Sequence, residues 1–188
     1  MALTETPNGD LGANCPEFNL LATDQRSYGR KDLISAKAYL IMFICNHCPY
    51  VLAIEDRLIA LGKELANQPF RAFAISSNDA IKYPIDSFPN MQKRAIEKGY
   101  PFPYLFDETQ LVAKSFGAVC TPDFFLYDGT LKLRYRGRLD DSWKDASLVR
   151  HQDLKNAIER LLAGEDVPAN QKSSMGCSIK WKPEMMTP

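Results

Sequence analysis

The chain lacks the features that would attract a polyanion or anchor it in a bilayer. Its 23 Lys and Arg residues balance 23 Asp and Glu residues, so the formal net charge is zero, and no basic stripe stands out. No apolar run approaches the ~20 residues that a membrane-spanning helix needs. The start, MALTETPNGDLGANC, has neither the basic nor the apolar region of a secretory signal. We therefore predict a cytoplasmic protein that binds neither nucleic acid nor membrane.

The chain also has few cysteines and histidines that could form a disulfide framework or a metal site. The five cysteines are an odd number, and only two of them stand close together, whereas small secreted domains carry an even disulfide framework. A structural zinc site usually needs a second close pair of Cys or His ligands, and the chain has only two histidines. We therefore predict no disulfide scaffold and no bound metal. With 188 residues, 45% of them hydrophobic, the chain is long enough for one substantial core.

The single close pair of cysteines lies in the motif Cys-Asn-His-Cys at residues 45–48. An apolar run at 38–44 precedes the motif and predicts a buried strand, and an amphipathic segment at 51–66 predicts a helix directly after it. A helix N-terminus carries a partial positive charge and favours a thiolate. The second cysteine is about one helical turn from the first, close enough to form a disulfide with it. We interpret the motif as a dithiol/disulfide redox centre, which needs no cofactor.

The rest of the chain alternates between patterns of strand and helix. Asp128-Gly129 between two apolar runs predicts a hairpin near the C-terminal end. This order predicts an α/β protein with a mixed central sheet and helices on both faces, built from residues 1–164 and followed by a tail at 165–188. Strands are expected near 18–24, 39–44, 70–76, 104–106, 124–127 and 131–135, and helices near 51–66, 86–98, 111–116 and 148–162.

Four stretches resemble the redoxin (AhpC/TSA-type) branch of the thioredoxin-like proteins. They are CPEFNL at 15–20, FICNHCP at 43–49, FPYLFD at 102–107 and VCTPDFFLYDG at 119–129. This branch includes thiol–disulfide oxidoreductases and peroxiredoxin-like proteins. The resemblance implies a three-layer thioredoxin-like sandwich with an extra N-terminal strand element.

The resemblance also assigns roles at the site. It makes Cys45 the exposed attacking thiol at the helix start and Cys48 the resolving thiol. It implies that Pro122 follows a cis peptide bond and that Thr121 presents its backbone to an extended substrate. We expect the imidazolium of His47 to lower the pKa of the Cys45 thiol, which would make the disulfide more oxidising.

The predicted function is thiol–disulfide exchange through a mixed disulfide. The partners would be a protein or small-molecule disulfide or thiol, together with an unidentified reductant or oxidant. One alternative is a peroxiredoxin-like peroxidase. That chemistry uses a threonine three residues before the reactive cysteine. In this chain Met42 occupies that position relative to Cys45, and Cys45 occupies it relative to Cys48. A second alternative is a non-enzymatic redox-sensing or binding module.

Two further thiols and the tail complete the predictions. Cys120, two residues before the expected cis proline, and Cys177 are possible additional redox thiols. Met175, Ile179 and Trp181 are apolar anchors that predict docking of the tail near the active-site end.

The proton acceptor for Cys48 stays open at this point. The strand at 39–44 contains no acid, and Glu55 lies two helical turns beyond the motif. The charged turn at 136–141, after the hairpin, is expected to be a solvated rim.

Overall fold

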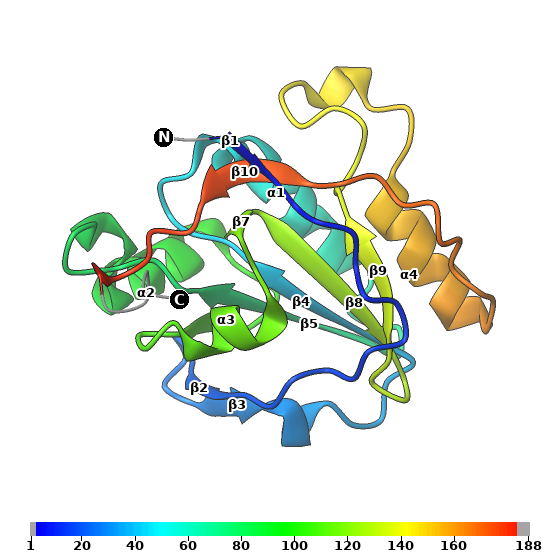
Figure 1. Cartoon of the computed structure of the whole chain (residues 1–188), viewed down its shortest axis with the longest axis horizontal. Helices are drawn as coiled ribbons and strands as arrows, with labels where there is room; N and C mark the ends of the chain where they lie inside the picture. Colours follow the sequence, from blue (N-terminus) through cyan, green and yellow to red (C-terminus); the bar gives the residue numbers. More distant parts are fainter. Residues whose placement is uncertain (1–2, 184–188) are drawn as a thin grey trace.

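A five-stranded mixed sheet forms the centre of the computed structural model, which describes residues 3–183 (Figure 1). The strand order is β6-β5-β4-β8-β9. β5 runs parallel to β4 and β6, whereas β8 runs antiparallel to β4 and β9. The strands are β4 (Ala38–Phe43), β5 (Phe70–Ser76), β6 (Tyr104–Phe106), β8 (Asp123–Asp128) and β9 (Leu133–Gly137). The predicted α/β class and thioredoxin-like arrangement are confirmed.

Helices cover both faces of this sheet because the central strand is apolar on both faces. Along β4, Leu40 and Met42 enter one core cluster, and Ile41 and Phe43 enter the other. The first cluster packs under α1 (Pro49–Glu64) and α4 (Asp153–Ala163), with Met91 of α2 (Phe88–Lys98). The second packs under α3 (Leu111–Phe116) and a hairpin of β2 (Asn19–Leu21) and β3 (Ser27–Gly29).

The helices end where the sequence indicates. Gly99, Gly117 and Gly164 follow α2, α3 and α4 with positive φ of 64°, 64° and 78°, the left-handed conformation that glycine adopts without strain. Three helix starts differ from prediction. α1 begins two residues earlier than expected, at Pro49 instead of 51. Pro84–Asp86 forms a 3-10 turn before α2, and α4 begins five residues later than expected, at Asp153 instead of 148.

A second, smaller sheet joins the two ends of the described chain. The order is β1-β10-β7, with antiparallel pairing throughout, and Figure 1 shows β1 and β10 side by side above α1. Its strands are β1 (Leu3–Glu5), β7 (Cys120–Thr121) and β10 (Met175–Ser178). Beyond β10, Ile179 is buried and donates its N–H to the Val119 carbonyl at 3.1 Å.

The tail therefore lies against the domain from Ser174 to Lys182, whose N–H donates to Gln110 Oε1 at 2.7 Å, and residues 184–188 of the predicted tail lie outside the described residues. None of the helices described here is long and apolar enough to cross a membrane.

Candidate active site

The two close cysteines lie in the loop between β4 and α1. Pro49 is the first residue of α1, where the missing N–H of proline costs nothing. The residue before a proline is restricted to extended conformations, and Cys48 has φ −69° and ψ 121°. Cys48 is therefore the N-cap of the helix, and Cys45 lies before the helix start. This differs from the sequence prediction, which placed Cys45 at that position.

Cys48 is the better site for a negative charge. As a thiol it donates to the Thr121 carbonyl oxygen, with Sγ···O 3.0 Å. Its pKa is lowered from the ordinary value, first because the Cys45 thiol donates a hydrogen bond to it. The Thr121 side chain and the backbone amides of Val51 and Cys177 add to this effect, while burial opposes it. Cys48 is thus at the positive N-terminal end of α1, although its side chain makes no capping hydrogen bond.

Cys45 has the opposite electrostatic character. Its pKa is raised, first by the hydrogen bond to Cys48, then by burial and by the charge of Asp86. Its Sγ also lies 3.4 Å from Oγ1 of Thr121. Both cysteines are buried, with exposed fractions of 2% for Cys45 and 0% for Cys48. Cys45 is therefore buried and not exposed as predicted, and the hydrogen bond to Cys48, burial and the Asp86 charge raise its pKa where a lowered one was expected.

The Thr121–Pro122 peptide bond is cis, as the resemblance implied. It joins β7 to β8 and faces the cysteine pair through both polar atoms of Thr121, the carbonyl oxygen toward Cys48 and the hydroxyl toward Cys45. The loop thus brings a residue more than 70 positions away in the chain against both thiols.

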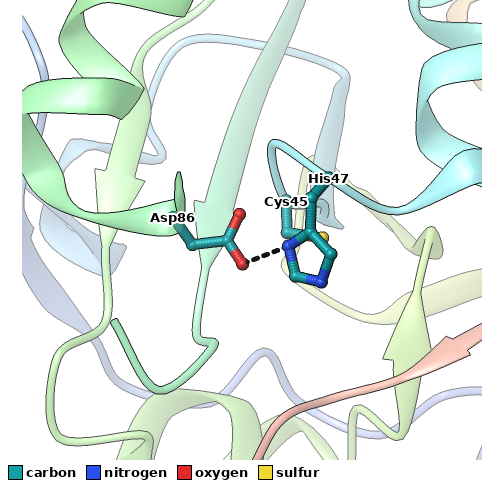
Figure 2. Close-up of side chains that lie close together, drawn as sticks. All are labelled: Cys45, His47 and Asp86. Carbon is teal, nitrogen blue, oxygen red and sulfur yellow. Dashed lines mark ion pairs between the residues drawn. The ribbon is translucent and has the colours of Figure 1, made fainter. Parts of the chain in front are cut away.

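A buried carboxylate, Asp86, lies beside the pair and was not found in the sequence. Figure 2 shows it directed at His47, with Oδ2 2.7 Å from Nδ1 of the imidazole. Asp86 is fully buried and also accepts from the Asn46 N–H and the Asn78 side chain, both at 2.8 Å. The His47 ring stacks on Tyr83, with centroids 5.5 Å apart. His47 is thereby fixed in position beside Cys45.

Three potential metal ligands meet at this point. Cys45 Sγ, a His47 nitrogen and an Asp86 oxygen all lie within 4.8 Å of one another. Thiolate, imidazole and carboxylate together suit zinc. The Asp86 oxygens, however, already accept two other hydrogen bonds, and these would compete with a metal. The buried Nδ1 of His47 makes no hydrogen bond, and its 2.7 Å ion-pair contact with Asp86 Oδ2 is what orients the imidazole.

The other three cysteines have different surroundings. Cys177, in β10, is buried and hydrogen-bonded through its side chain to Cys48. Cys120 is buried in β7 and donates to the Pro122 carbonyl at 3.6 Å, and burial raises its pKa. Cys15 belongs to the other core cluster, and burial raises its pKa to about 12. The structure therefore brings Cys177 to the site and leaves Cys15 out of it.

The remaining acids and arginines named in the sequence have structural partners. Glu55 is buried and binds Arg94 through two hydrogen bonds of 2.6 and 2.7 Å, so it is an anchor between α1 and α2. Arg136 is not part of a solvated rim. It is 7% exposed and pairs with the fully buried Asp123 at 2.9 Å.

A hollow that Pro122 lines is small. It has a volume of about 120 Å³ and is lined in part by Tyr50, Trp143 and Met175. Ligand pockets are usually about 300–1,000 Å³. With β10 in place, this hollow is too small to hold a polypeptide.

Comparison with known proteins places this fold among redoxins. A model described as the AhpC/TSA family matches residues 11–136. The chain is similar to an uncharacterized conserved protein from Geobacillus kaustophilus, with 46% identity and TM-score 0.93, covering 97% of this chain and 98% of the other. It is also similar to the hypothetical protein SMc02350 from Sinorhizobium meliloti 1021, with 36% identity and TM-score 0.92, covering 96% and 99%. No curated protein matches the chain.

More distant structures share the fold. The thioredoxin domain of thiol-disulfide oxidoreductase BVU-2223 from Bacteroides vulgatus has 16% identity and TM-score 0.64, covering 82% of this chain and 99% of the other. Peroxidoxin BcpB from Mycobacterium tuberculosis has 18% identity and TM-score 0.58, covering 81% and 94%.

Proposed function

Because this chain belongs to the AhpC/TSA family, we propose that it is a thiol–disulfide oxidoreductase in which Cys45 and Cys48 alternate between dithiol and disulfide. The observation that carries the proposal is that both thiols lie against Thr121, the residue before the cis proline, with the Cys45 sulfur 3.4 Å from its Oγ1 and the Cys48 sulfur 3.0 Å from its carbonyl oxygen. Two thiols in contact can exchange with a disulfide and then close on each other.

Within this function we propose that Cys48 attacks and Cys45 resolves, the reverse of the order that the resemblance implied. The thiolate is the nucleophile in disulfide exchange, and the donors around Cys48 stabilise its thiolate. Cys45 is protonated while Cys48 is charged, because it donates to the Cys48 sulfur.

The proposed reaction is balanced within the protein and its substrate. The Cys48 thiolate attacks one sulfur of the substrate disulfide, forms a mixed disulfide and releases the first substrate thiolate. The loss of charge on Cys48 removes the main cause that raises the pKa of Cys45. Cys45 then gives up its proton, attacks Cys48, and releases the second substrate thiolate. The substrate gains two electrons, and an external dithiol reduces the resulting disulfide.

We propose that His47 receives the proton that leaves Cys45 and that Asp86 holds the imidazole in position for this. Their ring and carboxylate lie within 4.8 Å of the Cys45 sulfur, and His47 is the more exposed of the two. A peroxidase is less well supported, because that chemistry uses an arginine to position the peroxide. In the part of the chain described here, the buried Arg136 is bound to Asp123 and the half-buried Arg94 to Glu55.

The test uses dithiobis(nitrobenzoate), a disulfide that releases one coloured thiolate at each attack. The reduced wild-type protein is expected to release thiolate rapidly and to turn over the disulfide when dithiothreitol recycles it. Cys48→Ser should lose the rapid phase, whereas Cys45→Ser should keep the first release at high pH. Cys120→Ser is the matched control and should behave as wild type.

Other outcomes would support a different order of the thiols or one of the alternative functions. A rapid phase that survives in Cys48→Ser but not in Cys45→Ser restores the order implied by the resemblance. Rapid consumption of hydrogen peroxide with no disulfide reduction identifies a peroxidase. A protein that does neither is a sensor or binding module.

A further inference from the structure

The C-terminal strand brings a third thiol to the attacking cysteine. β10 pairs with β7 so that Cys177 is opposite Thr121, whose carbonyl oxygen lies 3.0 Å from Cys48 Sγ. The Cys177 side chain is hydrogen-bonded to Cys48, and its backbone N–H also donates to that sulfur. Cys177 is 4% exposed, so this contact is made in the interior.

The position of Cys177 is fixed from both sides. At Gly176, an added Cβ would lie 2.0 Å from the Thr121 carbonyl oxygen, so only glycine allows this approach. Ser174 donates its hydroxyl to the Pro122 carbonyl at 3.0 Å, and Lys180 donates its N–H to Asn78 Oδ1 at 2.8 Å. These bonds hold β10 in one register against the cis-proline loop.

We propose that Cys177 is a second resolving thiol for Cys48, so that the site forms two alternative disulfides, Cys45–Cys48 and Cys48–Cys177. The proposal rests on the proposed function, in which Cys48 carries the mixed disulfide. It adds a route by which the mixed disulfide is resolved from the C-terminal strand.

When Cys48 is joined to a substrate thiol, the Cys177 thiol loses its proton to solvent and attacks the Cys48 sulfur. The Cys48–Cys177 bond forms as the bond from Cys48 to the substrate breaks, and the substrate leaves as a thiolate that takes up a proton. Cys48 and Cys177 are oxidised, and the substrate disulfide is reduced to two thiols.

The charge of Cys48 controls when Cys177 can act. Burial raises the pKa of Cys177, and the hydrogen bond and charge of Cys48 raise it further. The mixed disulfide removes the charge on Cys48, so these two causes disappear at the point in the cycle where a resolving thiolate is needed. The nearby Lys180 lowers the pKa of Cys177 throughout.

Cys120 is the natural control. It is also buried, and it belongs to the strand that β10 pairs with, where Ser178 is opposite Cys120. Its thiol donates to the Pro122 carbonyl instead of to Cys48. Because Cys120 lies in the same sheet but does not contact the Cys48 sulfur, we expect that it does not resolve the mixed disulfide.

The first measurement counts the thiolate released from dithiobis(nitrobenzoate) per protein chain, at high pH and without recycling reductant. Cys45→Ser is expected to release two equivalents, because Cys177 resolves the mixed disulfide. Cys45→Ser/Cys177→Ser should stop at one equivalent and retain the bound aromatic thiol by mass. Cys45→Ser/Cys120→Ser should still release two.

The second measurement locates the disulfide in the isolated monomer after alkylation and trypsin digestion. Cys45 and Cys48 share the tryptic peptide 38–57, whereas Cys177 is in 173–180 and Cys120 in 115–132. A link between 38–57 and 173–180 is expected in wild type, enriched in Cys45→Ser and absent from Cys48→Ser.

The two measurements distinguish a failure of the Cys177 proposal from a failure of the proposed function. If the first equivalent is missing from every protein that keeps Cys48, the proposed function is wrong. If Cys45→Ser releases only one equivalent and the link to 173–180 is absent, Cys177 is not a resolving thiol, while the proposed function stands. A link to 115–132 in its place would transfer the role to Cys120.

Discussion

At the scale of the residue, the proline after the second cysteine decides which thiol caps the helix. Pro49 restricts Cys48 to an extended conformation, so α1 begins directly after it and Cys48 is the N-cap residue. Cys45 lies one turn earlier in the loop and interacts with Thr121 and with the Asp86 carboxylate. The two cysteines of one short motif therefore have pKa values shifted in opposite directions.

This asymmetry predicts the pH dependence of alkylation. Because the pKa of Cys48 is lowered, its thiolate persists below the ordinary thiol pKa of about 8.5. Iodoacetamide should modify Cys48 fastest at neutral pH, as measured by peptide fragmentation. In Cys45→Ser the thiol donor to Cys48 becomes a hydroxyl that is placed differently, and the midpoint of the profile should move to higher pH. Faster alkylation of Cys45 than of Cys48 would contradict the assignment.

Asp86 gives a second prediction at this scale. Asp86→Ala removes the acceptor of the buried Asn46 N–H and Asn78 side chain. A buried donor left without a partner costs about 1–3 kcal/mol, so urea denaturation should show a loss of that size or more. The exposed Asp56, which pairs with Lys98, is the matched control, and Asp56→Ala should change the stability little. Equal effects of the two substitutions would remove the special role of Asp86.

At the scale of the element, β8 and β9 are joined across the sheet by a buried ion pair. Asp123 begins β8 directly after Pro122, and Arg136 near the end of β9 binds it with two nitrogens at 3.2 and 2.9 Å. The guanidinium also lies 4.4 Å from the Phe125 ring centroid. The pair thus fixes the strand that begins at the cis-proline loop.

Breaking this pair should be costly. Arg136→Met leaves Asp123 buried without its cation, which typically costs about 3–5 kcal/mol. Burial already raises the pKa of Asp123, and the loss of Arg136 should raise it further. A carboxyl with a raised native pKa binds its proton more tightly in the folded state, so stability should fall as pH rises from about 4 to that pKa. Asp123→Asn/Arg136→Met should recover stability, and a double variant as unstable as Arg136→Met would contradict this account.

At the scale of the whole molecule, the two ends of the described chain meet over the active site. β1 and β7 flank β10, and β10 packs on α1 (Figure 1). Cys177 of β10 belongs to the same core cluster as Cys45 and Cys48. This arrangement explains why both thiols are buried in a protein whose proposed chemistry requires contact with a substrate. We therefore expect the C-terminal strand to control access to the thiols.

Displacing β10 should therefore expose the site. In Gly176→Val the added side chain would clash with the Thr121 backbone and separate β10 from β7. We expect faster alkylation of Cys45 and Cys48 and faster tryptic cleavage after Lys180 than in wild type. Ser173→Val places the same side chain at an exposed position in the same segment and serves as the control. Unchanged alkylation in Gly176→Val would show that β10 does not limit access.

The sequence by itself determined the local features of this protein. Runs of apolar residues predicted the central strands, glycines predicted the ends of α2 and α3, and the motif at 45–48 predicted two thiols within reach of each other. These features depend on residues close together in the chain, where periodicity and backbone preference act directly. The Cys-Pro step at 48–49 was also a local signal, and it could have placed Cys48 at the helix start.

Only the tertiary structure decided what surrounds the thiols. Asp86 reaches the site from a 3-10 turn 40 residues away from Asn46, and Cys177 reaches it from a strand whose partner Thr121 lies more than 50 residues earlier in the chain. Neither residue belongs to a pattern, because a contact between distant segments leaves no periodic trace in either one. The pKa of each cysteine depends on burial and on these distant donors and charges, so the proposed order of the two thiols rests on the fold and not on their spacing.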